Sequence, residues 1–139
     1  MLGGVEIAYH HGLSGHSDAD VATHAVIDAV LGAAGMGDIG ALFPDTDPAY
    51  KDVSSLVLLR DVVARVTAAG WRVVNVDLVI VAERPRIAPH RAAMAALLAG
   101  ALGGGSEALG VKATTTEGMG FEGRGEGVSA TAGCLLEQT

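Results

Sequence analysis

The stretch from Trp71 to Ala82 constrains the fold most strongly, because part of it is apolar on both faces. A strand of this kind is typical of the middle of a sheet, where other elements cover it on both sides. Asn75 and Asp77 interrupt the stretch, which is also too short to cross a bilayer as a helix. We therefore expect a central strand at this position.

The segments around this strand predict further strands and helices. Alternating apolar residues indicate strands, and apolar residues at helical spacing between capping residues and glycines indicate helices. The expected elements are a strand at Val5–Tyr9, a helix from Ser17 or Asp18 to Ala34, a helix from Asp52 or Ser54 to Gly70, a helix at His90–Leu102, and strands at Val111–Thr115 and Gly127–Leu136. This order predicts one α/β domain over residues 1–139, an α+β sandwich with a mixed four-stranded sheet and three helices on one face.

The composition favours association of this chain with copies of itself. Hydrophobic residues make up 50% of the sequence and aromatic residues only 4%, so the core must consist of Ala, Val, Leu and Ile. Each of these side chains buries little area.

A net charge of −7 argues against nucleic-acid binding. We interpret the single cysteine, Cys134, as a buried small hydrophobe, and with no signal peptide in view we expect a cytoplasmic protein.

A first group of residues that could bind an anion or a metal lies at the expected start of the first helix. His16 and Ser17 precede the helix, and Asp20 and His24 are one turn apart, so they share a face. Free N–H groups at the helix start favour an anion, and a histidine with carboxylates can bind a divalent metal. The alternative is a capped, solvated helix start with incidental histidines.

A second group follows in the expected loop, at Gly37–Gly40 and Phe43–Asp47. Asp and Gly in an ordered loop can hold a sugar hydroxyl or a metal-bound water. The same residue types are ordinary turn formers, so a simple turn stays open as the alternative.

A third group is Lys112–Glu117, where three threonines precede a glutamate. Hydroxyls and a carboxylate at a strand end suit a phosphate with Mg²⁺, and the alternative is an edge strand of β-branched residues. Thr115 and Glu117 sit two apart on a strand-like segment, so we expect them to point to the same face.

Two pairs of residues outside these groups could also have either a binding role or a structural one. Arg84 and Arg86 either face an anion or belong to a solvated turn. Phe121 and Arg124, in a glycine-rich stretch, either contact a ligand or pack at a subunit contact.

Taken together, these motifs resemble those of one family, the 2-C-methyl-D-erythritol 2,4-cyclodiphosphate synthases of the non-mevalonate isoprenoid pathway. The resemblance covers the whole chain, in the family's order. The motifs that carry it are His16-Ser17-Asp18-Ala19-Asp20, Gly37-Asp38-Ile39-Gly40, Phe43-Pro44-Asp45-Thr46-Asp47, Lys112–Glu117 and Gly123-Arg124-Gly125-Glu126-Gly127.

The resemblance implies a homotrimer with active sites between neighbouring subunits. It implies an intramolecular phosphoryl transfer, in which the 2-phosphate of 4-diphosphocytidyl-2-C-methyl-D-erythritol 2-phosphate attacks the β-phosphate and CMP leaves. It also implies Zn²⁺ that polarises the β-phosphate and Mg²⁺ or Mn²⁺ that bridges the α- and β-phosphates.

Roles for individual residues follow from the same resemblance. His24 matches a zinc ligand and Glu117 the Mg²⁺ ligand, while His16 and Thr115 match groups that stabilise the transition state. The matched substrate-binding positions are Ser17, Asp38, Ile39, Gly40, Phe43, Pro44, Asp45, Thr46, Asp47, Ala82, Arg86, Ile87, Ala88, Thr114, Thr116, Glu117, Phe121 and Arg124.

The sequence departs from the family in two places. Members of the family begin with a strand carrying Asp-x-His, which supplies two zinc ligands, and this sequence contains no Asp-x-His. A misassigned start, a fragment and a degenerate relative are three open explanations. We expect weak zinc binding or none from the residues present, and a non-catalytic trimeric module that binds a nucleotide or an isoprenoid diphosphate is the alternative function. Arg86 replaces a usual lysine, which keeps the charge but changes its geometry.

Overall fold

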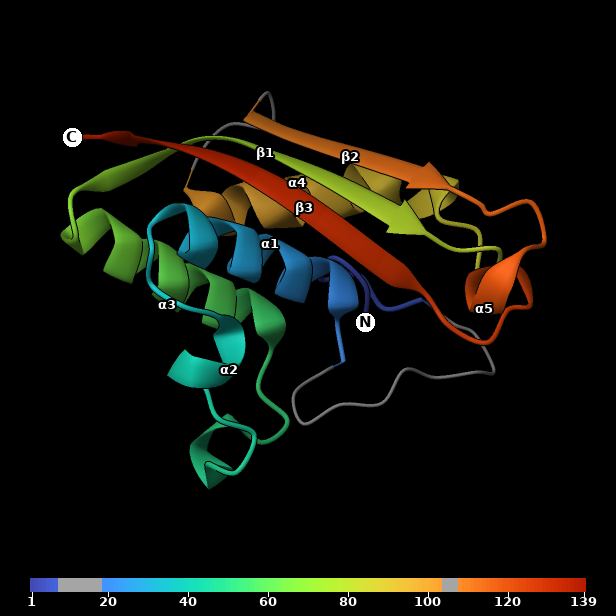
Figure 1. Ribbon diagram of the computed structural model, residues 1–139, viewed down its shortest axis with the longest axis horizontal. Coiled ribbons are helices and arrows are strands. Elements are labelled where there is room, and N and C mark those ends of the chain that lie inside the picture. Colours follow the sequence, from blue (N-terminus) through green and yellow to red (C-terminus); the bar gives the residue numbers. More distant parts are fainter. Residues whose placement is uncertain (8–18, 104–107) are drawn as a thin grey trace.

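The computed structural model describes residues 1–7, 19–103 and 108–139. In these residues a three-stranded mixed sheet has the order β2-β1-β3, as Figure 1 shows. The central strand is β1 (Trp71–Val81), which pairs in parallel with β2 (Leu109–Thr114) and antiparallel with β3 (Ser129–Gln138). The prediction of a central strand from the apolar stretch is confirmed.

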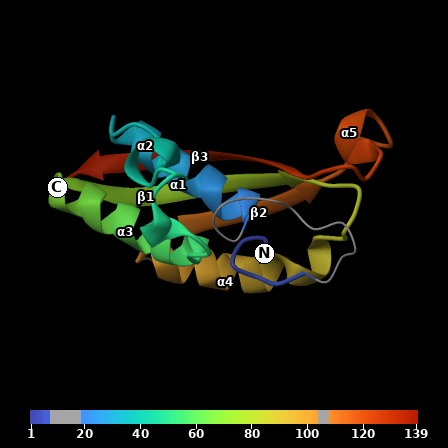
Figure 2. The ribbon, with the colours of Figure 1, turned by 90° about the horizontal axis from the view of Figure 1, so that it is seen from below.

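Three long helices lie along one face of this sheet (Figures 1 and 2). They are α1 (Val21–Ala33), α3 (Ser55–Ala68) and α4 (Arg91–Leu102), close to the three that the sequence predicts. Short elements in the connections were not predicted. These are α2 (Ile39–Leu42), η1 (Pro48–Tyr50), η2 (Ala88–His90) and α5 (Gly120–Gly123).

The hydrophobic core fills the layer between the sheet and the helices. On β1, Val76 and Leu78 are buried, whereas Asp77 between them is exposed. This alternation turns one face of the strand to the helices. Ile27 on α1, Leu59 on α3 and further aliphatic side chains complete the core, as the composition predicts.

The strand register places one set of candidate residues at a common edge of the sheet. Val81 at the end of β1 is paired with Thr114 at the end of β2 and with Ser129 at the start of β3. The backbone N–H of Ala82 donates to the carbonyl oxygen of Thr114 at 3.0 Å, which extends the pairing by one residue. The loops that follow β1 and β2 therefore leave the sheet side by side.

The expected first strand is wrong over its described part. Leu2 and Val5 form only an isolated bridge around a tight turn, and Tyr9 lies outside the described residues. Gly3 and Gly4 have φ values of +56° and +80°, which turn the chain back instead of extending it. The described sheet accordingly has three strands rather than four.

The cap of the first helix also differs from expectation. Asp20 is the N-cap of α1, whereas Ser17 and Asp18 lie outside the described residues. The fully buried carboxylate of Asp20 accepts hydrogen bonds from the backbone N–H groups of Gly3 (2.8 Å), Gly4 (2.7 Å) and Thr23 (2.9 Å), and from the Thr23 hydroxyl (2.7 Å). One side chain thus joins the N-terminal turn to the start of α1.

No helix in the described part of the chain is long and apolar enough to cross a membrane.

Replacing Asp20 by Ala should lower the free energy of unfolding by about 3 kcal/mol, because the helix loses its cap and buried donors lose their acceptor. Asp38→Ala is the matched control, since Asp38 caps only the short, exposed helix α2 and should cost about 1 kcal/mol or less. Urea denaturation of both variants measures the difference. Equal losses would show that the Asp20 carboxylate does not hold the turn and helix together.

Candidate functional site

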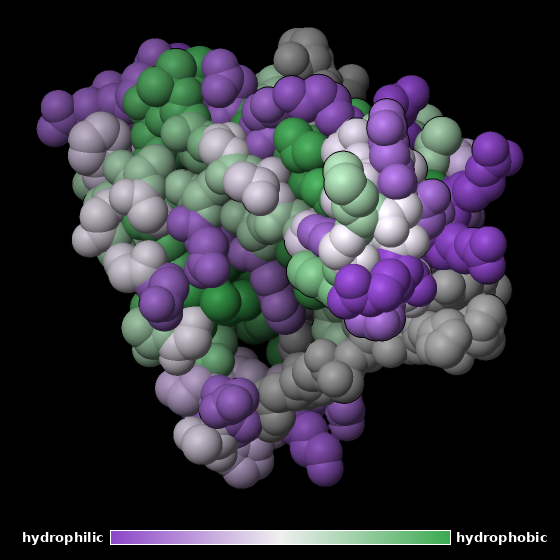
Figure 3. Space-filling model, turned by 45° about the vertical axis from the view of Figure 1, so that its right-hand side comes forward, coloured by the Kyte–Doolittle hydropathy of each residue, from purple (hydrophilic) through white to green (hydrophobic). Residues whose placement is uncertain are grey.

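A pocket of about 400 Å³ lies beside the N-terminal half of α1. It brings His24 together with five residues of the second sequence group. Its lining residues are His24, Ile39, Gly40, Phe43, Pro44, Asp45, Tyr50 and Leu58. In Figure 3 a hollow with hydrophobic side chains on its wall opens above the lobe formed by α2 and η1.

Two aspartates fix the short helix α2 at the edge of this pocket. The Asp28 carboxylate on α1 accepts a hydrogen bond from the backbone N–H of Ile39 at 2.8 Å, and the Asp38 carboxylate accepts one from Ala41 at 2.9 Å. Asp38 itself does not line the pocket. Its observed contact is the cap of the short helix α2.

Aromatic packing forms the apolar wall. The rings of Phe43 and Tyr50 meet edge to face, with centroids 5.1 Å apart, and the Arg65 guanidinium lies 5.6 Å from the centroid of the Phe43 ring. Phe43 is only 6% exposed. Tyr50 and Leu58 were not predicted as site residues from the sequence. The pattern of the helix does not distinguish Leu58 from its other core residues.

His24 enters the pocket from α1 with one ring nitrogen already engaged. Its Nε2 lies 2.8 Å from the hydroxyl oxygen of Ser55, the fully buried first residue of α3. Local sequence patterns do not indicate this contact, because the two residues are 31 positions apart.

The third sequence group lies at the sheet edge where β1 and β2 end. The strand β2 stops at Thr114, so Thr115 and Glu117 do not share a strand face, and that prediction is wrong. Glu117 adopts a left-handed φ of +54°, and its backbone N–H donates to the Thr115 hydroxyl oxygen at 3.2 Å. The chain thus turns sharply here and leaves the Glu117 side chain exposed.

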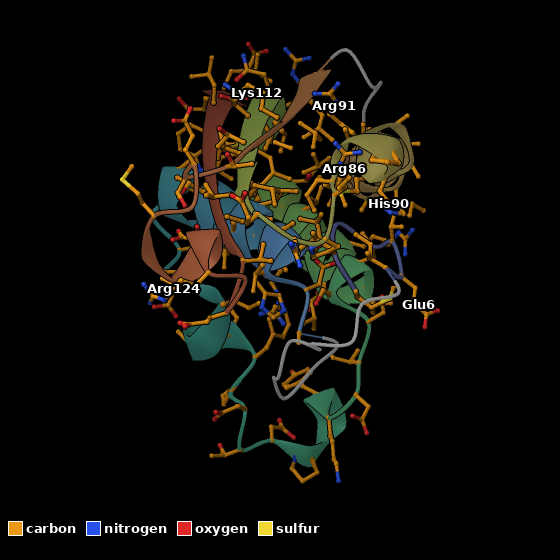
Figure 4. The ribbon with its side chains drawn as sticks, turned by 90° about the vertical axis from the view of Figure 1, so that its right-hand side faces the viewer. Glu6, Arg86, His90, Arg91, Lys112 and Arg124 are labelled. Atoms are coloured by element: carbon orange, nitrogen blue, oxygen red, sulfur yellow. The ribbon has the colours of Figure 1, made fainter. Side chains whose placement is uncertain are left out.

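Arginines from two loops flank this edge. Figure 4 shows Arg86 beside the start of α4 and Arg124 at α5, on opposite sides of the strand ends. The Arg124 guanidinium makes two hydrogen bonds to Glu126, at 2.8 and 3.1 Å. These hydrogen bonds raise the pKa of Arg124 and lower the pKa of Glu126. Phe121, in the same short helix, is 45% exposed.

The structure therefore divides the predicted site residues into two groups. His24 and the residues around Phe43 form the pocket, whereas Ala82–Ala88, Thr114–Glu117, Phe121 and Arg124 do not line it. His16 and Ser17 lie outside the described residues. Within the ranges that are described, no three His, Cys, Asp or Glu side chains are grouped so that they could hold a metal ion.

Solved structures of high similarity share this fold. The bifunctional IspDF of Campylobacter jejuni matches with a TM-score of 0.94 and 40% identity, over 100% of this chain and 38% of that one. A 2C-methyl-D-erythritol-2,4-cyclodiphosphate synthase in its CDP-bound form matches with a TM-score of 0.89 and 38% identity, over 99% of this chain and 89% of that one. These likenesses define the class as the α/β fold of the cyclodiphosphate synthases.

Sequence comparison gives the family itself. The model of the YgbB family matches residues 1–137. The 2-C-methyl-D-erythritol 2,4-cyclodiphosphate synthase of Bordetella avium is 57% identical over 136 residues, which are 98% of this chain and 84% of the relative. The chain belongs to the YgbB family, and the relatives' names favour an enzyme over a non-catalytic binding module.

Cys134 lies on β3, away from the pocket, and packs against the core. Burial raises the pKa of its thiol, so less thiolate is present at neutral pH than in the unfolded chain. We predict that iodoacetamide alkylates the folded protein more slowly than the urea-unfolded chain at pH 7.5, and that the difference narrows as the pH rises. Because the sequence has one cysteine, mass spectrometry counts the modification directly. Equal rates in both states would contradict burial of the thiol.

Proposed function

We propose that this protein cyclises 4-diphosphocytidyl-2-C-methyl-D-erythritol 2-phosphate to 2-C-methyl-D-erythritol 2,4-cyclodiphosphate and releases CMP. The observation that carries this proposal is the pocket, in which residues far apart in the sequence match the family motifs within one cavity. Relatives with 54–57% identity carry the synthase name, and a CDP-bound synthase shares the fold.

The reaction moves one phosphoryl group within the substrate. An oxygen of the 2-phosphate attacks the β-phosphorus, a new P–O bond forms, and the bond between the β-phosphorus and the bridging oxygen breaks as CMP leaves. Such a transfer needs positioning and neutralisation of charge more than covalent help from the protein. His16 and Thr115 are the groups that we propose to stabilise the transition state.

The pocket suits the methylerythritol phosphate part of this substrate. Phe43, Tyr50 and Leu58 offer an apolar wall to its carbon skeleton, and Asp45 can accept hydrogen bonds from its hydroxyl groups. The segment after β1, from Ala82 to Ala88, and the turn at Thr114–Glu117 are proposed to hold the cytidine and the diphosphate.

These two groups of residues are proposed to meet between neighbouring subunits of a homotrimer. The face of the sheet opposite the long helices is uncovered in the described part of the chain (Figure 1). Leu135 on β3 is 55% exposed, Met119 just before α5 is 70% exposed, and Phe121 within α5 is 45% exposed. Exposed apolar side chains of this size support a subunit contact.

The two metals of the family differ in how well these residues fit them. Zinc needs three or four protein ligands, and His24 belongs to no such group among the described side chains, so these residues do not form a zinc site. Mg²⁺ is often held by one or two carboxylates together with substrate phosphates, so Glu117 suits that ion or Mn²⁺. The bound cation would offset the phosphate charge beside Glu117.

We predict that Glu117→Gln lowers the rate of CMP release by about 10²-fold and weakens its dependence on Mg²⁺, because the carboxylate that holds the cation is lost. Glu6→Gln removes the same charge from an exposed position and should leave the rate unchanged. The measurement is steady-state CMP release against Mg²⁺ concentration. An unchanged curve for Glu117→Gln would remove this residue from the site, and no CMP from the wild-type protein would contradict the proposed function.

A further inference from the structure

An arginine outside the pocket contacts its apolar wall. The Arg65 guanidinium lies over the Phe43 ring, with Cζ 5.6 Å from the ring centroid, and Phe43 lines the pocket. We propose that Arg65 is a positioning residue, which holds the Phe43 ring and so sets the shape of the wall that receives the methylerythritol phosphate part of the substrate. This inference rests on the proposed function and adds a residue that none of the sequence motifs contains.

The position of Phe43 makes its ring important for the whole wall. Phe43 ends α2, and its backbone N–H donates to the carbonyl oxygen of Ile39 at 2.8 Å. Pro44 and Asp45, which also line the pocket, follow it directly. A displaced Phe43 would therefore shift these two neighbours as well.

The contacts of the Phe43 ring with Tyr50 and with Arg65 come from different parts of the chain. Tyr50 belongs to η1, in the same lobe as Phe43, so its edge-to-face contact at 5.1 Å moves with that lobe. Arg65 belongs to α3, whose Leu59 and Val62 are fully buried in the core. The contact with Arg65 thus joins the wall of the pocket to a helix that is itself fixed.

Asp61 orients the guanidinium for this contact. Its two carboxylate oxygens accept hydrogen bonds from Nε and Nη2 of Arg65, at 3.4 and 3.3 Å. An exposed ion pair of this kind adds little stability, but its two-point geometry limits the rotation of the planar guanidinium. The positive charge is then kept over the negative face of the aromatic ring.

A double-mutant cycle tests the contact itself. Arg65→Met keeps an apolar stem and removes the charge, and Phe43→Leu removes the ring but stays apolar. The double variant should lose less unfolding free energy than the two single variants together, because each single change already removes the same contact. Urea denaturation measures all three variants. Losses that simply add would overturn the proposal.

Ligand binding tests the effect on the pocket. Calorimetry compares two probes, 2-C-methyl-D-erythritol 2,4-cyclodiphosphate, which carries the methylerythritol part, and CDP, which carries the cytidine and the diphosphate. Arg65→Met should weaken binding of the cyclodiphosphate about two- to fivefold, the size typical of an exposed cation–π contact, and leave CDP binding unchanged. Arg65→Lys restores a charge that can lie over the ring and should recover most of the affinity. Arg60→Met removes an exposed arginine from the same helix and should leave both affinities unchanged.

The pattern across the two probes separates positioning from a general structural role. A change that loosens the whole fold would weaken binding of both probes alike, and this result would overturn the proposal, as would an unchanged affinity of Arg65→Met for the cyclodiphosphate. In turnover, Arg65→Met should raise KM by a similar factor with little change in kcat, as expected when binding is lost equally in the ground state and the transition state. If the wild-type protein binds both probes but releases no CMP, the proposed function fails, while the binding data still decide the role of Arg65.

Discussion

The buried carboxylate of Asp20 is the interaction on which the geometry of the pocket depends. Its oxygens accept hydrogen bonds from the turn at Gly3-Gly4 and from the first turn of α1. A carboxylate that is buried away from water needs such hydrogen-bond donors, because burying it unpaired would cost several kcal/mol. The N-terminal turn and α1 therefore keep one relative position, and His24 follows Asp20 by one helical turn.

From this fixed helix the pocket is assembled by short connections. Asp28 on α1 holds α2 through the backbone of Ile39, and the chain that follows folds back so that Tyr50 packs on Phe43. Helix α3 then returns to α1 and places Ser55 against His24. The second group of residues depends on a different constraint, the pairing of β1 with β2 up to Thr114. Different contacts thus hold the pocket and the sheet edge. This separation agrees with the proposal that the two groups of residues meet between neighbouring subunits.

The sequence predicted the long elements well, and the loops poorly. Strand β1, with both faces partly apolar, and helices α3 and α4, ended near Gly70 and Gly103, follow from local patterns. Phe43, Pro44 and Asp45 of one predicted motif line the pocket with His24, whereas Thr46 and Asp47 of the same motif do not. What local patterns cannot give is a contact between distant residues: Gly3 with Asp20, or His24 with Ser55. The same reason explains the error at Glu117, where a turn with positive φ replaced the expected continuation of the strand.

The most direct test of the central claim, that the two groups of residues form one site across a subunit contact, is the activity of mixed trimers. His24→Gln damages the pocket and Glu117→Gln damages the sheet edge, so each variant alone should be nearly inactive. Co-expression with two different affinity tags isolates trimers that contain both variants. In a ring of three subunits, any such mixture restores one intact site, so CMP release should recover to about one third of the wild-type rate per trimer. Mixed trimers as inactive as either parent would contradict a site shared between subunits.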